Sequence, residues 1–168
     1  VMAQAVLELR PKAKLAFGPP IDHGFYYDFD LGEPLTPEDL PEIESRMRKI
    51  IGQKQEFVQS TRTVEAAVID LKARGETYKV EYAEELAGRG ETELGFYTNG
   101  PFEDMCRGPH VRHTGELPPD AFALESIAGA YWRGDEKRPQ LTRIYGAAFG
   151  NKKDLAEYQE RRRLARER

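Results

Sequence analysis

Cysteine, histidine and tryptophan are scarce in this chain of 168 residues, which contains one Cys, three His and one Trp. A single Cys cannot form a disulfide within the chain, so we expect a reducing, cytoplasmic environment. No apolar run approaches the roughly 20 residues that a membrane-spanning helix requires. The first residues, VMAQAVLELRP, also lack the basic start and the long apolar segment of a secretory signal. We therefore expect no membrane partner.

Positive charge is also in deficit, because the net charge is −4 at pH 7. This value argues against a protein that binds polyanions non-specifically. It remains compatible with a specific RNA contact, since a local basic patch can lie on an acidic body. Residues 134–143 and the tail 160–168 are the two basic candidates, and the tail is equally explained as the solvated face of a helix.

The remaining composition is that of a globular domain with one hydrophobic core, since 39% of the residues are hydrophobic and 32% are charged. Helical and strand patterns are interspersed along the chain. They predict an α+β fold in which helices pack on one face of a largely antiparallel sheet. We expect a core domain at residues 1–150, followed by an amphipathic helix at 151–168.

Helical periodicity and capping residues predict helices at 1–10, 36–53, 63–75 and 151–168. The first helix has no capping residue before Val1, so we expect it to begin upstream of this position. Thr36 and Pro37 form a helix start, and Leu40 opens a buried stripe. Strand patterns fall at 13–35 (two strands around a Gly-Pro-Pro turn), 56–64, 93–106 (around Asn99-Gly100), 122–134 and 141–149. Residues 78–86 combine a strand start with a short helix.

Residues 101–117, PFEDMCRGPHVRHTGEL, contain the only Cys and two of the three His. The C-x3-H spacing of Cys106 and His110 is half of a tetrahedral metal site, to which His113 would be a third ligand. A Cys-His pair without further ligands is more often a pocket wall or a packed thiol. A catalytic interpretation has His110 and Asp104 position a water molecule, or has His110 activate Cys106 as a nucleophile. The residues alone leave these alternatives open.

Other polar and aromatic residues also have two explanations each. Tyr27 lies in an alternating strand pattern and suits either the core or a site. Asp22 is explained by turn chemistry and Lys79 by a solvated surface. Tyr131 and Trp132 suit either stacking on a base or core packing.

Four runs of sequence resemble the editing domain, or second additional domain, of bacterial threonyl-tRNA synthetase, in its order and spacing. They are GPPIDHGFYYDFDL, RGETYKVE, DMCRGPHV and AGAYWRGDEKRPQLTRIYG. The wider superfamily includes the editing domain of alanyl-tRNA synthetase and freestanding relatives. The resemblance covers nearly the whole chain and implies hydrolysis of serine from mischarged tRNA(Thr).

Matched position by position, the resemblance implies that Tyr27, Lys79, Asp104 and His110 line the editing pocket. Cys106 falls at the family's cysteine. His110 is expected to position water or the seryl hydroxyl, Asp104 to bind the ammonium or hydroxyl group, and Lys79 to hold water or stabilise the oxyanion. Tyr27 would anchor the ribose. We add Asp22 and Arg107 as substrate-binding candidates.

The family pattern also has an H-x3-H element on the first helix, whose second His immediately precedes the position of Val1. Zinc at Cys106 and His110 would depend on that element, so we expect no metal or other cofactor to be required. The expected partners are the acceptor end of tRNA(Thr) carrying serine and the remaining domains of the synthetase, towards which residues 151–168 would lead. Two alternatives stay open: a freestanding zinc-dependent hydrolase of the alanine-tRNA type, and a module that binds the acceptor end without catalysis.

Overall fold

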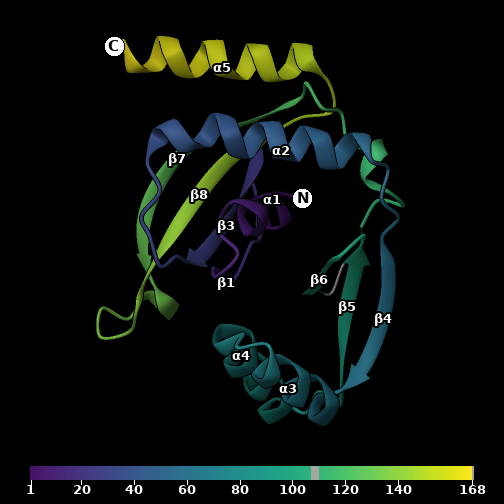
Figure 1. Ribbon diagram of the computed structural model, residues 1–168. Helices are drawn as coiled ribbons and strands as arrows, with labels where there is room; N and C mark the ends of the chain where they lie inside the picture. The colour runs from purple at the N-terminus through teal and green to yellow at the C-terminus, as the bar shows by residue number, and fades with distance from the viewer. Residues whose placement is uncertain (107–109, 168) are drawn as a thin grey trace.

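The computed structural model describes residues 1–106 and 110–167, whose strands form two antiparallel sheets with helices packed against each (Figure 1). The predicted α+β class is confirmed. The helices are α1 Met2–Leu9, α2 Leu40–Gly52, α3 Val64–Ala73, α4 Thr77–Gly88 and α5 Lys152–Arg166, with 3-10 turns η1 Pro37–Asp39, η2 Thr114–Glu116 and η3 Trp132–Gly134. The strands are β1 Lys14–Leu15, β2 Pro20–Ile21, β3 Gly24–Asp30, β4 Val58–Thr63, β5 Glu93–Asn99, β6 Phe102–Met105, β7 Phe122–Tyr131 and β8 Gln140–Ala148.

The larger half of the molecule consists of one sheet with α1 and α2 packed on it. The strand order is β1-β3-β8-β7, and β2 also pairs with β3. The core between the sheet and the helices contains Val6 of α1, Ile43 of α2, Phe29 of β3 and Ile144 of β8, each fully buried. The alternation of β3 therefore directs Phe29 into the core and leaves Asp28 on the other face, where Arg143 pairs with it at 2.8 Å.

The start of α2 follows from its sequence as predicted. The amide of Thr36 donates to the side chain of Asp39 at 2.8 Å, which is one arm of a capping box around the short turn η1. Pro37 occupies the first helical position, where its missing amide costs nothing. Leu40, the first residue of α2, is buried on the stripe that faces the sheet.

The smaller half consists of β4, β5 and β6 in that order, together with α3 and α4. Thr63 caps α3, because its hydroxyl accepts a hydrogen bond from the amide of Ala66 at 3.2 Å. The predicted hairpin at Asn99-Gly100 is confirmed, and Gly100 adopts the left-handed conformation that this turn requires. The core of this half joins Leu71 of α3, Ala83 of α4 and Phe96 of β5.

The strand expected at the start of residues 78–86 is absent, and this prediction was wrong. These residues lie within α4, which is helical from Thr77 to Gly88. Alternation of Tyr78, Val80 and Tyr82 with polar residues imitates a strand pattern. In the fold, Ala83 and Leu86 face the core of the smaller half while Tyr78 faces the larger half. A helix therefore buries apolar side chains on two of its sides at once.

The two halves meet along α4 and along the start of α1. The hydroxyl of Tyr78 donates to Asp30 at 2.6 Å, and its ring packs with Trp132 and Leu141 in a small apolar cluster. At the other contact, the buried amide of Asn99 donates to Gln4 at 2.6 Å and to Gln55 at 2.9 Å. Side chains therefore cross between the halves at both places.

Helix α5 lies at the edge of the molecule, along the top of the view in Figure 1 and above α2. Its N-cap is Asn151, whose side chain accepts from the amide of Asp154 at 2.9 Å. Only Leu155 is buried among its described residues. An open groove of about 540 Å³ separates part of α5 from β7. Among the described residues, no helix is both long and apolar enough to cross a membrane.

Candidate functional site

The carboxylate of Asp104 joins two side chains that lie far from it in the sequence. The hydroxyl of Tyr27 donates to Oδ2 of Asp104 at 2.7 Å, and Nζ of Lys79 lies 3.0 Å from Oδ1. Tyr27 comes from β3 of the larger half, whereas Lys79 on α4 and Asp104 on β6 belong to the smaller half. The site therefore lies at the junction between the two halves.

Local structure explains how these side chains reach one another. Asp104 is paired with Tyr97 across the β5–β6 hairpin, and Tyr27 is paired with Ile144 across β3 and β8. The ring of Tyr27 lies against the backbone of Gly18, where a Cβ atom would stand only 2.0 Å from Cδ2 of the ring. The ring of Tyr27 can therefore occupy this position only because residue 18 of the Gly-Pro-Pro segment has no side chain.

Lys79 is buried, with 5% of its surface exposed, so its explanation as a surface lysine is wrong. A buried ammonium group is strongly unfavourable unless a counter-charge and hydrogen bonds compensate for lost water. Asp104 supplies that counter-charge, and the rings of Phe17 and Tyr27 lie 5.8 and 5.7 Å from Nζ. Lys79 is accordingly a fixed, partly desolvated cation.

Burial raises the pKa of Tyr27 well above its usual range, and the charge and hydrogen bond of Asp104 raise it further. Tyr27 is therefore a neutral hydrogen-bond donor across the physiological pH range. Glu76, which the sequence analysis did not single out, belongs to the same environment. Burial raises its pKa, the hydrogen bond from the amide of Leu15 opposes that rise, and the charge of Asp104 adds to it. Its place at the start of α4, three residues before Lys79, is the only sequence signal that it gives.

His110 lies above an aromatic surface next to this junction. Its ring stacks on Tyr97 with centroids 4.0 Å apart and contacts Phe57 at 5.0 Å. Burial lowers the pKa of His110 below its usual 6.5, while the charge of Asp104 opposes that shift. At neutral pH the imidazole is therefore neutral and able to accept a proton. Tyr97 and Phe57 were not predicted, because strand aromatics usually fill cores.

Cys106 directly follows β6 and is partly buried. Its amide donates to the carbonyl of Gly95 at 3.0 Å, and Gly95 permits this approach because a Cβ there would lie 2.9 Å from the carbonyl oxygen of Cys106. Within the described residues, no three or more His, Cys, Asp or Glu side chains are arranged to hold a metal ion. His113 instead lies in a bridge with Glu56 before η2 and is not brought to Cys106 and His110 as a third ligand. Among the described residues, Cys106 and His110 therefore have no third His, Cys, Asp or Glu arranged with them as a zinc ligand.

The remaining predicted site residues lie elsewhere or outside the description. Asp22 is exposed in the two-residue turn between β2 and β3. Among the described residues, no hydrogen bond or ion pair joins it to Asp104. Arg107 lies outside the described residues. Trp132 is buried in the apolar cluster, whereas Tyr131 is exposed, so only Tyr131 is accessible for stacking on a base.

The arrangement combines a fixed cation and a neutral phenol on one carboxylate with a neutral imidazole that stacks on Tyr97, the strand partner of Asp104. A cation in a partly desolvated position stabilises developing negative charge, and a neutral imidazole accepts a proton from water. These groups suit hydrolysis of an ester or amide through attack by water.

Comparisons with known proteins agree on one family. The family described as "Threonyl and Alanyl tRNA synthetase second additional domain" matches residues 94–145, which include β5, β6, Asp104, Cys106 and His110. The threonine–tRNA ligase of Citrifermentans bemidjiense is 49% identical over 168 residues, which is 100% of this chain and 26% of the relative. Those of Gloeobacter violaceus (47% over 168 residues, 100% and 26%) and Dinoroseobacter shibae (48% over 158 residues, 94% and 24%) are similar. The chain spans about a quarter of the length of these curated relatives.

Proposed function

Because this chain belongs to the threonyl and alanyl tRNA synthetase second additional domain family, we propose that it is the editing module of a threonine–tRNA ligase. Its substrate in this proposal is tRNA(Thr) mischarged with serine. Serine and threonine differ by one methyl group, which provides only about 1–3 kcal/mol of discrimination in a binding pocket. A second site that hydrolyses the seryl ester and excludes the threonyl methyl group supplies the missing accuracy.

One observation carries the proposal: Asp104 holds both the ammonium group of Lys79 and the hydroxyl of Tyr27. These three residues come from separate segments, and each falls where the family resemblance puts a pocket residue. Lys79 is buried and paired with Asp104, which is not explained by a role as a solvated surface residue. Its geometry supports a role in binding the charged transition state of ester hydrolysis.

In the proposed reaction, neutral His110 accepts a proton from water as the water oxygen attacks the ester carbonyl carbon. Lys79 stabilises the negative charge that develops on the carbonyl oxygen. When the bond to the ribose oxygen breaks, that oxygen takes the proton from His110, and serine and uncharged tRNA are released. Asp104 keeps Lys79 and Tyr27 in place, and its carboxylate also attracts the ammonium group of the seryl moiety. Tyr27 anchors the ribose.

Cys106 lies at the wall of this site in the proposal, and no step passes through a metal ion. Threonine–tRNA ligases among the relatives favour a threonine-specific module over a freestanding hydrolase of the alanine type. The expected partners are the acceptor end of tRNA(Thr) and the other domains of the ligase, with residues 151–168 leading towards its aminoacylation domain. A cytoplasmic location follows from this role and remains a prediction.

The test is deacylation of Ser-tRNA(Thr) and Thr-tRNA(Thr) by the full-length protein that carries this chain. The proposal predicts that the seryl ester is hydrolysed faster, and that Lys79→Met and His110→Ala each slow hydrolysis by about 100-fold or more, as expected for loss of charge stabilisation or of a general base. Lys72→Met is the matched control, because Lys72 is exposed and pairs with Glu84 at 3.7 Å away from the site.

Full activity of either site variant would reject the assigned role of that residue. Activity that is lost on chelation and restored by zinc would favour the zinc-dependent alternative. Tight binding of a seryl-adenosine analogue by a wild-type protein that does not hydrolyse the ester would favour a non-catalytic acceptor-end module.

A further inference from the structure

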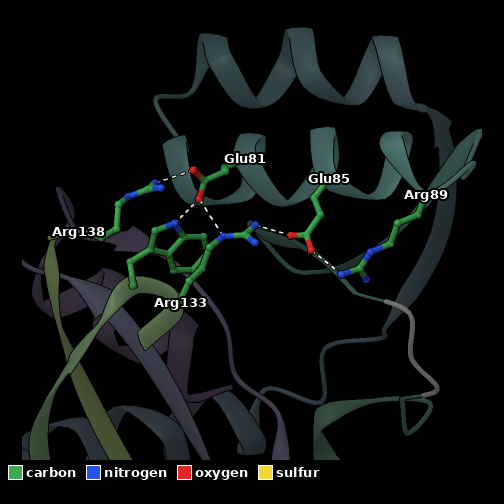
Figure 2. Close-up of polar contacts among 6 residues, drawn as sticks. Glu81, Glu85, Arg89, Arg133 and Arg138 are labelled. Carbon is green, nitrogen blue, oxygen red and sulfur yellow. Dashed lines mark hydrogen bonds and ion pairs between the residues drawn. The ribbon is translucent and has the colours of Figure 1, made fainter. Parts of the chain in front are cut away.

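A network of charged side chains joins α4 to the β7–β8 connection on the other side of the helix from Asp104. Figure 2 shows Glu81 and Glu85 extending from α4 towards Arg133 and Arg138. Glu81 accepts hydrogen bonds from Nη2 of Arg138 at 2.5 Å, from Nε of Arg133 at 3.1 Å and from the indole of Trp132. The carboxylate of Glu81 thus accepts hydrogen bonds from residues at both ends of the β7–β8 connection.

Glu85, one turn further along α4, extends this network. It accepts a hydrogen bond from Nη2 of Arg133, and on its other oxygen from Nη2 of Arg89 at 2.5 Å (Figure 2). Arg133 belongs to the larger half and Arg89 directly follows α4, so only the pair with Arg133 crosses between the halves. Hydrogen bonds from Arg138 and Arg133 lower the pKa of Glu81 and Glu85 respectively, and both carboxylates are ionised at neutral pH.

The backbone of Arg133 is unusual, which indicates that its position is determined by its partners. It has φ 57° and ψ 24°, a left-handed conformation that disfavours a residue with a long side chain. This conformation directs one guanidinium group to both Glu81 and Glu85. The conformation of the β7–β8 connection therefore matches the positions of Glu81 and Glu85 on α4.

The same helix supplies Lys79 to the site, two residues before Glu81. The position of Lys79 relative to Tyr27 depends on how α4 lies against the larger half, because Tyr27 belongs to β3. The network at Glu81 fixes α4 to that half, with Phe17 packed against Tyr82 at 4.6 Å and stacked on Trp132 at 5.1 Å beside it. Lys79 and Asp104 both belong to the smaller half, so this contact sets where that pair lies relative to Tyr27.

We propose that Glu81, held by Arg133 and Arg138, is a positioning residue that sets α4 so that Lys79 and Tyr27 share the carboxylate of Asp104. The inference rests on the proposed function where hydrolysis is concerned, and on geometry alone where the position of Lys79 is concerned. Glu81 touches no reacting atom in this account and acts through Lys79.

The experiment compares Glu81→Gln with Glu84→Gln in the full-length protein. Glu84 is a glutamate on the same helix that pairs only with exposed Lys72 among the described residues, so it matches Glu81 in type and position but not in contacts. Single-turnover hydrolysis of Ser-tRNA(Thr) is expected to slow by about 10- to 100-fold in Glu81→Gln, with little change in substrate affinity, as for a slightly misplaced catalytic group. Glu84→Gln should behave as the wild type.

Combination with Lys79→Arg separates positioning from general weakening of the fold. If Glu81 acts through Lys79, the effects of Glu81→Gln and Lys79→Arg will not multiply in the double variant. Independent effects on a folded protein, or equal rates in Glu81→Gln and Glu84→Gln, would overturn the inference. Arg138→Met, at an exposed position on the other side of the network, gives the same prediction if Glu81→Gln does not fold.

A measurement without turnover keeps the two proposals apart. The ¹³Cε resonance of Lys79, assigned by its loss in Lys79→Met, should move in Glu81→Gln and stay unchanged in Glu84→Gln. A wild-type protein without hydrolase activity would reject the proposed function, yet this resonance would still decide whether Glu81 positions Lys79. An unchanged resonance in folded Glu81→Gln rejects the positioning role, whatever the activity of the wild type.

Discussion

At the scale of single residues, the site depends on how burial changes the charge of its members. Burial favours the neutral form of an imidazole, so His110 loses its proton at a lower pH than a solvated histidine does. Lys79 keeps its charge partner within 3.0 Å, whereas His110 has no carboxylate at that distance among the described residues. His110 thus adds a neutral base to a site in which the amine of Lys79 is paired with a carboxylate.

This difference predicts a pH dependence. Hydrolysis by the full-length protein should be constant around neutral pH and fall as the pH drops through the lowered pKa of His110, below 6.5, because the protonated ring cannot accept a proton. The folded state should also lose stability below pH 6.5, since the unfolded imidazole takes up its proton first. A pH–rate profile of the wild type and of His110→Gln checks the first point. An acid limb that persists unchanged in His110→Gln would contradict it.

At the scale of elements, the segment from β1 to β2 determines the position of the Tyr27 ring through one glycine. Gly18 lies between β1 and β2, and its backbone makes space for the ring of Tyr27. The sequence suggested only a turn at this Gly-Pro-Pro segment. In the fold, β1 before Gly18 and β2 after it both pair with β3, and the tight turn comes later, before Gly24.

Gly18→Ala should therefore disturb Tyr27 directly. The added methyl group would overlap the ring, so we expect a loss of about 1–3 kcal/mol in the free energy of unfolding, as for overpacking, and a slower hydrolysis. Gly32→Ala is the matched control, since a Cβ at Gly32 meets nothing within 4 Å. Urea unfolding of both variants provides the comparison. Equal stability of the two would show that the ring of Tyr27 moves aside without cost.

Elements with strong local signals could be predicted from the sequence, and contacts between distant elements could not. The capping box before α2 and the Asn99-Gly100 hairpin are local, so their residues alone specify them. The burial of Lys79 depends on Asp104, which lies 25 positions further along the chain, and no local pattern records that contact. Family resemblance pointed to Lys79 because it carries information about tertiary structure. It gave no indication of the stack of His110 on Tyr97.

At the scale of the whole molecule, the two halves are joined by polar contacts at both ends of their junction. Glu81 and its partners lie at one end, and the buried amides of Gln4 and Asn99 lie at the other with the partly buried amide of Gln55. Buried amides are costly to leave without partners, so these contacts favour one arrangement of the halves over others.

Asn99→Leu should accordingly destabilise the docked arrangement. The side chain of Asn99 is 2% exposed, and its loss leaves the carbonyl oxygens of Gln4 and Gln55 without this donor, at a cost of about 1–3 kcal/mol. Thr98→Val, on the same hairpin but bonded only to partly exposed Glu103, should change stability by less than about 0.5 kcal/mol. Urea unfolding measures both. An unchanged free energy of unfolding in Asn99→Leu would indicate that water replaces the lost donor.

The placement of Asp104 at the junction also limits how the chain can be reused in protein engineering. A segment of residues 93–110 grafted onto a foreign scaffold would bring Asp104, Cys106 and His110, but neither Lys79 from α4 nor Tyr27 from β3. Such a chimera would possess the C-x3-H motif and lack the contacts of Asp104 with Lys79 and Tyr27. Transplantation would have to move both sheets together with α4, which contacts both halves.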